Sequence, residues 1–104
     1  MRFEWDEDKA ARNKDLHGVS FEDATELFET DADVLEMYDV EHSANEDRFK
    51  SLGPIRRGLI LVVWTERTDE VIRIISAWCA TKAEQQMYRD FVEQLHGREK
   101  RTDG

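Results

Sequence analysis

The spacing of hydrophobic residues changes along the chain, from a helical period near both ends to strand-like runs in the middle. Helical spacing predicts one helix that begins after the N-cap Ser20 and another over 81–97, which opens with a capping box at Thr81. The runs 34–40 and 48–52 are predicted to be strands, and the strongest strand predictions are 59–67 and 71–77, which are rich in β-branched residues. A short polar loop joins the last two runs, so we expect them to form a hairpin.

The N-terminal stretch predicts a short strand followed by a helix with both ends marked. Asp6 is a favoured N-cap residue, and Gly18 stands where a left-handed residue commonly ends a helix. On this helix Lys9, Asn13 and His17 recur every four residues, so they form one polar row on its surface. A cation, an amide and an imidazole in one row can bind an anion and move a proton, and we identify them as candidate site residues.

The order of predicted elements is strand, helix, helix, four strands and helix. Consecutive strands joined by short turns favour antiparallel pairing, and Gly53–Pro54 and Arg56-Arg57-Gly58 are expected to mark a turn region. We therefore predict an α+β domain over residues 1–97, in which an antiparallel sheet of four to five strands carries two N-terminal helices and one C-terminal helix. Gly97 is expected to end the last helix, and the charged residues 98–104 are predicted to form a disordered tail.

Charge is unevenly distributed over the 104 residues, whose net charge is −9. Residues 1–47 contain 16 acidic and four basic side chains, whereas residues 48–104 contain eight acidic and 11 basic ones. Two interpretations follow, and both can hold at once. In one, the basic half faces an anionic substrate, and in the other, the acidic half faces a basic partner. The longest apolar run is strand-sized and no apolar leader precedes the domain, so we expect a cytoplasmic protein that contacts no membrane.

The sequence contains no glycine-rich phosphate loop, no HExxH pair and no paired cysteines, so we expect neither a cofactor nor a bound metal ion. The predicted hairpin supplies cations instead. If residues 68–70 form its loop, Arg67 lies opposite Val71. Thr65 then lies opposite Arg73, and both arginines share one face of the sheet. Two such arginines can clamp a phosphate, or they can form surface ion pairs with nearby carboxylates.

Aromatic and imidazole side chains complete the candidate chemistry. Trp64 and Trp78 can stack on nucleic-acid bases or pack in the core. His17, at the end of its helix, can act as a general acid or bond the last carbonyls of the helix. His42 and His96 receive no role from their positions. Together with the arginines, these groups suggest metal-free RNA cleavage by the 2′-hydroxyl, which needs only a base, an acid and positive charge at the phosphate, although the sequence does not identify the base.

One ordered set of residues extends through the chain from residue 3 to about residue 90. Its first part is the run Trp5-Asp-x-x-Lys9-x-x-x-Asn13-x-x-x-His17-Gly18-Val19-x-Phe21-x-x-Ala24. Its middle and end are Asp39, His42-Ser43, Glu46-Asp47-Arg48-Phe49, Gly53, Thr65-Glu66-Arg67, Arg73-Ile74-Ile75-Ser76-Ala77, Ala80-Thr81, Glu84 and Tyr88. Each piece is short, but the ordered set is specific, and it resembles the BrnT family of toxins.

The resemblance implies a RelE-like ribonuclease fold and a toxin of a type II toxin–antitoxin pair that cleaves RNA and arrests growth. It also implies neutralisation by a DNA-binding antitoxin of the BrnA kind, through which alone the toxin contacts operator DNA. With the chemistry above, we predict the catalytic residues His17, Arg67, Arg73 and Lys9, and the substrate-binding residues Trp78, Arg48 and Asn13.

The chain departs from the family pattern at Trp78 and Cys79, where the family usually places arginines, and at Leu16, where a basic residue is common. Each cation near a developing phosphate charge contributes on the order of a few kcal/mol, so these changes predict weakened cleavage. Besides the active ribonuclease, two other functions of the chain remain open. The chain is an attenuated homologue that keeps antitoxin binding and operon regulation, or it is a small interaction domain unrelated to toxins.

Overall fold

Five strands form one mixed sheet in the order β1-β5-β4-β3-β2. The computed structural model describes residues 1–68 and 70–101, with side chains of the last helix described as far as Gly97. The strands are β1 (Arg2–Glu4), β2 (Leu35–Tyr38), β3 (Phe49–Ile55), β4 (Gly58–Thr68) and β5 (Val71–Cys79). The predicted α+β class and strand number are confirmed. The prediction of an antiparallel sheet is wrong for β1, which lies parallel to β5 because no tight turn joins these two distant segments.

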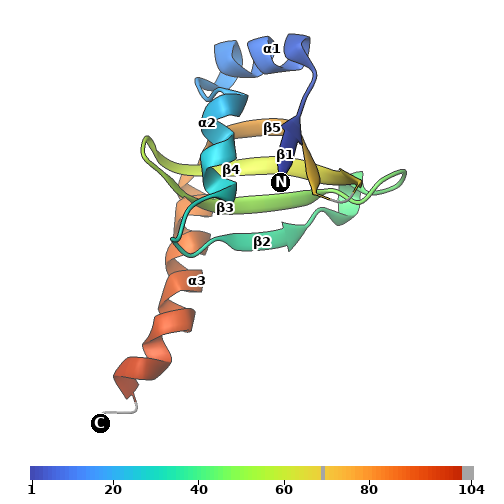
Figure 1. Ribbon diagram of the computed structural model, residues 1–104. Helices are drawn as coiled ribbons and strands as arrows, with labels where there is room; N and C mark the ends of the chain where they lie inside the picture. The colour runs from blue at the N-terminus through green and yellow to red at the C-terminus, as the bar shows by residue number, and fades with distance from the viewer. Residues whose placement is uncertain (69, 102–104) are drawn as a thin grey trace.

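The helical segments lie at the edge and on the faces of this sheet (Figure 1). They are α1 (Glu7–His17), α2 (Phe21–Thr25), η1 (Glu26–Phe28), η2 (Val40–His42) and α3 (Lys82–Arg101). Helix α1 runs along the edge formed by β5, α2 crosses one face, and α3 projects away from the sheet, which gives the molecule extents of 53 × 28 × 26 Å. None of the described helices is both long and apolar enough to span a membrane.

Both predicted ends of α1 are confirmed. The carboxylate of Asp6 accepts a hydrogen bond from the backbone N–H of Lys9 (3.1 Å), and this bond lowers the pKa of Asp6. At the other end, Gly18 has a left-handed conformation with φ of 72°, and its N–H donates to the carbonyl of Lys14. The local signals in the sequence therefore determine the length of this helix.

Strand β3 continues through Gly53–Pro54, so the predicted turn at this position is wrong. Pro54 pairs with Leu59 on β4, whereas β2 ends its pairing with β3 at Leu52, so no neighbouring strand on that side requires an N–H from the proline. Gly53 is needed for close packing, because a Cβ there would lie 2.9 Å from Cδ1 of Leu27. The chain turns at residues 56–58, where the second part of the predicted turn region is confirmed and the φ of Gly58 is 130°.

The last helix also differs from its prediction at the C-terminal end. Helix α3 passes through Gly97 and continues to Arg101, so Gly97 does not end it. The arginines, glutamate and lysine at 98–101 are good helix formers, which offsets the unfavourable glycine. Of the predicted tail, residues 102–104 lie outside the described residues.

The hydrophobic core lies on both faces of the sheet. On the face covered by α2 and η1, the buried members include Phe21, Ala24, Leu27, Ile60, Val62, Ile72, Ile74 and Ala77. On the other face, Leu52, Leu61, Val63 and Ala80 are buried with Trp78 and Tyr88 packed against them. Trp64 belongs to the first face, where its ring stacks on Phe49 at 4.8 Å and its Nε1 donates to Ser51 Oγ (2.8 Å). Of the two roles open to Trp64, the structure therefore supports core packing.

Two ion pairs connect the short helical segment to the β3–β4 turn. Arg57 Nη1 lies 2.9 Å from Asp23 Oδ2, and Arg56 Nε lies 3.2 Å from Glu26 Oε1. The hydrogen bond from Arg57 lowers the pKa of Asp23 below its ordinary value. These exposed pairs orient the turn on α2 and contribute little to stability by themselves.

Asn13 attaches α1 to the sheet. Its side-chain Nδ2 donates to the carbonyl of Ala77 (2.7 Å), and its Oδ1 accepts from the N–H of the same residue (3.2 Å). Further bonds join it to the carbonyl of Val19 (3.0 Å) and the hydroxyl of Ser76 (3.1 Å). Because β1 pairs with β5 only as far as Arg73, the Asn13 amide replaces the missing neighbour strand at Ala77.

We expect Asn13→Ala to reduce the free energy of unfolding by about 2–4 kcal/mol, because it leaves buried backbone groups of Ala77 without partners. Urea denaturation followed by circular dichroism measures the change. The matched control is Arg12→Ala, at a neighbouring exposed position of α1, which should change stability by less than about 0.5 kcal/mol. Equal losses in the two variants would contradict this role of Asn13.

Candidate functional site

The structure divides the predicted site residues between two ends of β5. Arg73 pairs with Thr65 near the β4–β5 hairpin, as predicted, whereas Trp78 pairs with Leu61 near the end of α1. Five residue positions separate Arg73 from Trp78, which corresponds to roughly 15 Å along a strand. The residues predicted to form one site therefore form two groups.

The first group consists of His17 and Trp78. Their ring centroids lie 6.0 Å apart with an interplanar angle of 49°. Trp78 Nε1 donates to Glu84 Oε1 (3.0 Å), and the same oxygen accepts from the backbone N–H of Thr81 (3.0 Å). The capping box of α3 thus holds the indole beside an exposed imidazole, which leaves a partly exposed aromatic surface at this end of β5.

Lys9 and Asn13 do not extend this group into one polar surface. Lys9 is exposed in the first turn of α1, about 12 Å from His17 along the helix axis. Asn13 lies between them but is only 7% exposed, and both polar atoms of its amide bond to the protein. The amide is therefore used to position α1, and its predicted place in an exposed row is wrong.

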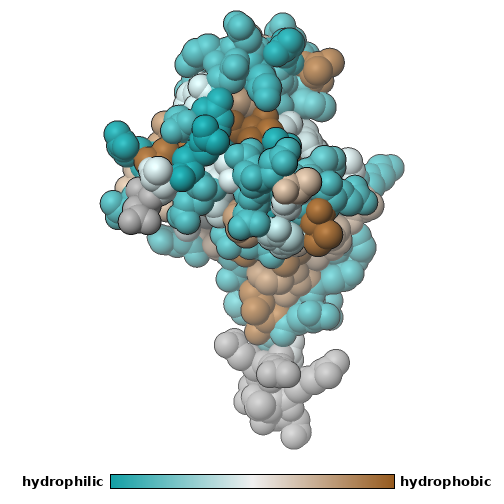
Figure 2. Space-filling model, turned by 90° about the vertical axis from the view of Figure 1, so that its right-hand side faces the viewer, coloured by the Kyte–Doolittle hydropathy of each residue, from teal (hydrophilic) through white to brown (hydrophobic). Residues whose placement is uncertain are grey.

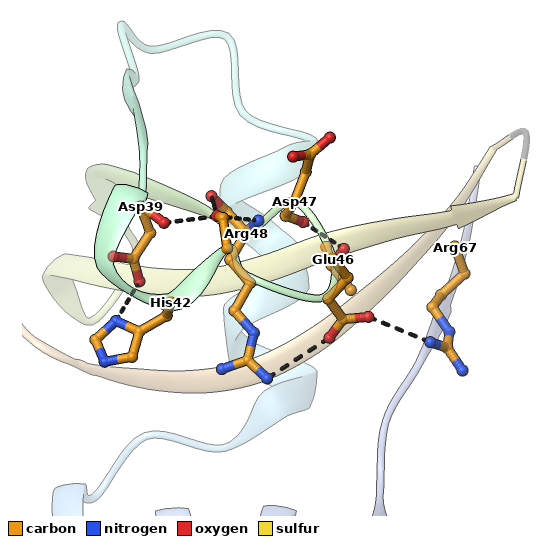
Figure 3. Close-up of polar contacts among 8 residues, drawn as sticks. Asp39, His42, Glu46, Asp47, Arg48 and Arg67 are labelled. Carbon is orange, nitrogen blue, oxygen red and sulfur yellow. Dashed lines mark hydrogen bonds and ion pairs between the residues drawn. The ribbon is translucent and has the colours of Figure 1, made fainter.

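The second group consists of arginines paired with carboxylates near the hairpin, and Figure 3 shows two of them, Arg48 and Arg67, on either side of Glu46. Arg67 Nη1 lies 3.3 Å from Glu46 Oε2, and Arg48 Nη2 lies 3.6 Å from the other oxygen of the same carboxylate. Arg73 Nη1 bonds Glu4 Oε2 at 2.6 Å on the adjacent strand β1. The carboxylate of Glu46 thus lies between the guanidinium groups of Arg48 and Arg67, in a position that another anion could occupy.

The register of the hairpin differs from its prediction at Arg67. Thr68, rather than Arg67, pairs with Val71, and Arg67 lies in an irregularity between Glu66 and Thr68. Such bulges change the direction of a side chain. Arg67 is thereby able to reach Glu46 in the loop between β2 and β3.

Hydrogen bonds hold the β2–β3 loop in place. The Ser43 hydroxyl donates to the carbonyl of Asp39 (2.6 Å) and accepts from the N–H of Arg48 (2.9 Å). The N–H of Asp39 donates to the carbonyl of Arg48 (2.8 Å), and the buried Thr65 hydroxyl donates to the carbonyl of Asp47 (2.6 Å). These bonds explain how a polar loop keeps its side chains at defined positions over β4.

This loop also carries a histidine to which its sequence position assigned no role. His42 Nδ1 lies 2.9 Å from Oδ2 of Asp39, whose side chain is 6% exposed, while that of His42 is 58% exposed. Beside them lies a depression of about 280 Å³ lined by His42, Ala44, Asn45, Glu46 and Arg48. The spacing Asp-x-x-His was the signal in the sequence that could have predicted this contact, because residues three apart lie close together in a helical turn.

Within the described residues, no group of three or more His, Cys, Asp or Glu side chains is arranged to hold a metal ion. Cys79 is exposed and forms no disulfide.

Helix α3 presents a partly uncovered apolar side (Figure 2). Met87 and Leu95 are 43% and 48% exposed. The Tyr88 hydroxyl donates to the carbonyl of Asp33 (2.7 Å), and burial, followed by the charge of Asp33, raises the pKa of Tyr88. This contact joins α3 to the segment before β2 and leaves the helix beyond it projecting from the sheet.

The sequence also matches a known class of proteins. A model described as "Ribonuclease toxin, BrnT, of type II toxin-antitoxin system" matches residues 5–84. The chain therefore belongs to the BrnT family, and the predicted resemblance is confirmed. Most of α3 lies beyond the matched residues.

A solved structure supports the same relationship. The crystal structure of the Brucella abortus ribonuclease toxin BrnT is similar with a TM-score of 0.58 and 25% sequence identity, covering 79% of this chain and 99% of that chain. The search of curated proteins found no match.

We expect Glu46→Gln to strengthen binding of single-stranded RNA, because it releases Arg48 and Arg67 from a competing carboxylate. Fluorescence anisotropy across a salt series measures this, and the slope of log K against log salt should steepen by about 0.7 for each additional phosphate contact. The control Glu93→Gln removes the same charge on exposed α3 and should have a smaller effect. Equal effects would mean that only net charge matters.

Proposed function

We propose that this chain is an endoribonuclease that needs no metal ion and arrests growth by cleaving RNA. The observation that supports this most directly is that Arg48 and Arg67 share the carboxylate of Glu46. The loop that carries Glu46 bonds to Thr65, the residue opposite Arg73, and His42 lines a depression with Arg48. Guanidinium and imidazole groups are sufficient for cleavage by the 2′-hydroxyl.

In this proposal the arginines bind the scissile phosphate and stabilise the charge that develops on it. Arginine forms paired hydrogen bonds to phosphate oxygens, and two or three guanidiniums can share one phosphate. Their present partners, Glu46 and Glu4, are partly exposed carboxylates. An RNA phosphate can therefore replace them without exposing the core.

The residues at the other end of β5 receive a different role in this proposal. His17 and Trp78 lie too far along the strand to act on a phosphate held at Arg73, so we assign them to stacking on a neighbouring base. Lys9 attracts the RNA backbone from the exposed side of α1. Asn13 acts only by positioning the helix. The predicted catalytic roles of His17 and Lys9 are thereby replaced by substrate binding.

The partner in this proposal is a DNA-binding antitoxin of the BrnA kind. Membership of a type II toxin–antitoxin family implies an antitoxin. The strongly acidic residues 1–47 suit a basic partner, which would bring the complex to operator DNA, and we place both proteins in the cytoplasm.

Production of the chain without an antitoxin should arrest growth, and the purified protein should cleave cellular RNA in the presence of EDTA. Arg73→Ala should lower the cleavage rate by about 10²-fold, the usual effect of losing one transition-state contact. Arg89→Ala, on the exposed side of α3, is the matched control. Continued growth together with intact RNA would contradict the proposed enzyme.

A second function is supported by the ion pairs themselves. Arg48, Arg67 and Arg73 are all paired with carboxylates, and Trp78 and Cys79 stand where relatives usually carry arginines. An attenuated toxin would keep its antitoxin-binding and operon-regulating role after losing cleavage.

The double substitution Trp78→Arg and Cys79→Arg distinguishes these two functions. If the chain is attenuated because it binds RNA too weakly, two arginines beside His17 should hold a neighbouring RNA phosphate and create growth arrest that the unmodified chain lacks. Plating efficiency after induction measures the difference. Equal toxicity of the two proteins would exclude attenuation.

A further inference from the structure

The pair formed by Asp39 and His42 has the geometry of an oriented base. A carboxylate can only accept a hydrogen bond, so the ring nitrogen Nδ1, 2.9 Å from Asp39 Oδ2, carries the proton. In the neutral ring the other nitrogen, Nε2, then has a free electron pair. The carboxylate of Asp39 is buried, whereas the imidazole of His42 is mostly exposed. Asp39 therefore fixes the ring through Nδ1, and the rest of the ring is accessible to a substrate.

The backbone around this pair is well supported. Asp39 and Arg48 bond to each other across the base of the loop, and the Ser43 hydroxyl bridges them. His42 itself belongs to the short helical turn η2. A base in this position keeps its orientation without help from a ligand, which is what proton transfer in a defined geometry requires.

Cations lie on the side to which the imidazole points. In Figure 3, His42, Arg48 and Arg67 extend from three segments toward the same side of the loop, and His42 and Arg48 line one depression. The Nε of Arg48 is buried with no hydrogen-bond partner among the described residues, so its guanidinium retains an unused donor. An anion bound by Arg48 in this depression would lie on the side of the loop to which the imidazole points.

His96 provides an internal comparison. Its Nε2 lies 2.8 Å from Asp33 Oδ2, but that carboxylate is 41% exposed, and the pair joins α3 to the segment before β2. A histidine–aspartate contact therefore occurs twice in the described chain, and only His42 combines it with a buried carboxylate and with Arg48 and Arg67.

We propose that His42 is the general base of the RNA cleavage, an inference that rests on the proposed function, and that Asp39 is its positioning residue. Nε2 removes the proton of the 2′-hydroxyl while the 2′-oxygen bonds to phosphorus. The bond from phosphorus to the 5′-oxygen breaks, and that oxygen takes a proton from water. The products are a 2′,3′-cyclic phosphate and a 5′-hydroxyl, and His42 returns its proton to the resulting hydroxide.

The test measures single-turnover cleavage of a mixed-sequence RNA pool in EDTA by the full chain and its variants. His42→Gln should lower the rate by about 10²-fold or more, the usual contribution of a general base, without changing RNA binding. His96→Gln is the matched control and should leave the rate unchanged. Added imidazole should restore part of the activity of His42→Ala, which a merely structural role would not allow.

Asp39→Asn tests the positioning role. It should lower the rate by about tenfold or more, and nitrogen NMR of the neutral His42 ring should show the proton no longer confined to Nδ1. A change in rate with an unchanged ring signal would overturn the role of Asp39.

The outcomes separate this inference from the proposed function. If the chain cleaves RNA and His42→Gln cleaves as fast as His96→Gln, or if His17→Gln alone abolishes cleavage, the inference is wrong and the proposed function stands. If neither the chain nor the control variant cleaves RNA or arrests growth, the proposed function fails and the inference fails with it.

Discussion

The arrangement of the N-terminal half depends on the bonds between the Asn13 amide and the backbone of Ala77. The short strand β1 pairs only with residues 71–73 and leaves most of the outer edge of β5 without a neighbour strand, and a buried edge with unpaired N–H and C=O groups is costly. One side chain satisfies both groups and holds α1 along this edge. That position brings His17 to Trp78 and sets where α2 enters the core.

A second constraint builds the arginine group from distant segments. Thr65 and Ser43 hold the β2–β3 loop over β4, and the bulge at Arg67 turns that side chain toward the loop. Both features are needed before Arg48 and Arg67 can meet at Glu46. The site is therefore a product of the sheet register, and a shift of one residue in β4 would separate its members.

Ion pairs between the acidic and the basic half of the chain neutralise part of its uneven charge. Glu4 and Glu46 belong to the acidic half and pair with arginines of the basic half. Glu46 holds the guanidiniums of Arg48 and Arg67 together, and both carboxylates would compete with the phosphate of the proposed RNA substrate. In the proposed function, this competition would lower the affinity of the arginines for RNA, and neither the fold nor family membership determines by how much.

Local signals in the sequence determined the ends of α1, the hairpin, the pairing of Thr65 with Arg73 and the family. Capping, alternation and ordered motifs act over a few residues, so they can be read without the fold. The parallel pairing of β1, the inward direction of Asn13 and the contact between Asp39 and His42 were decided by tertiary structure. Each depends on which groups another segment leaves unpaired or buries, and a residue's type and spacing do not contain that information.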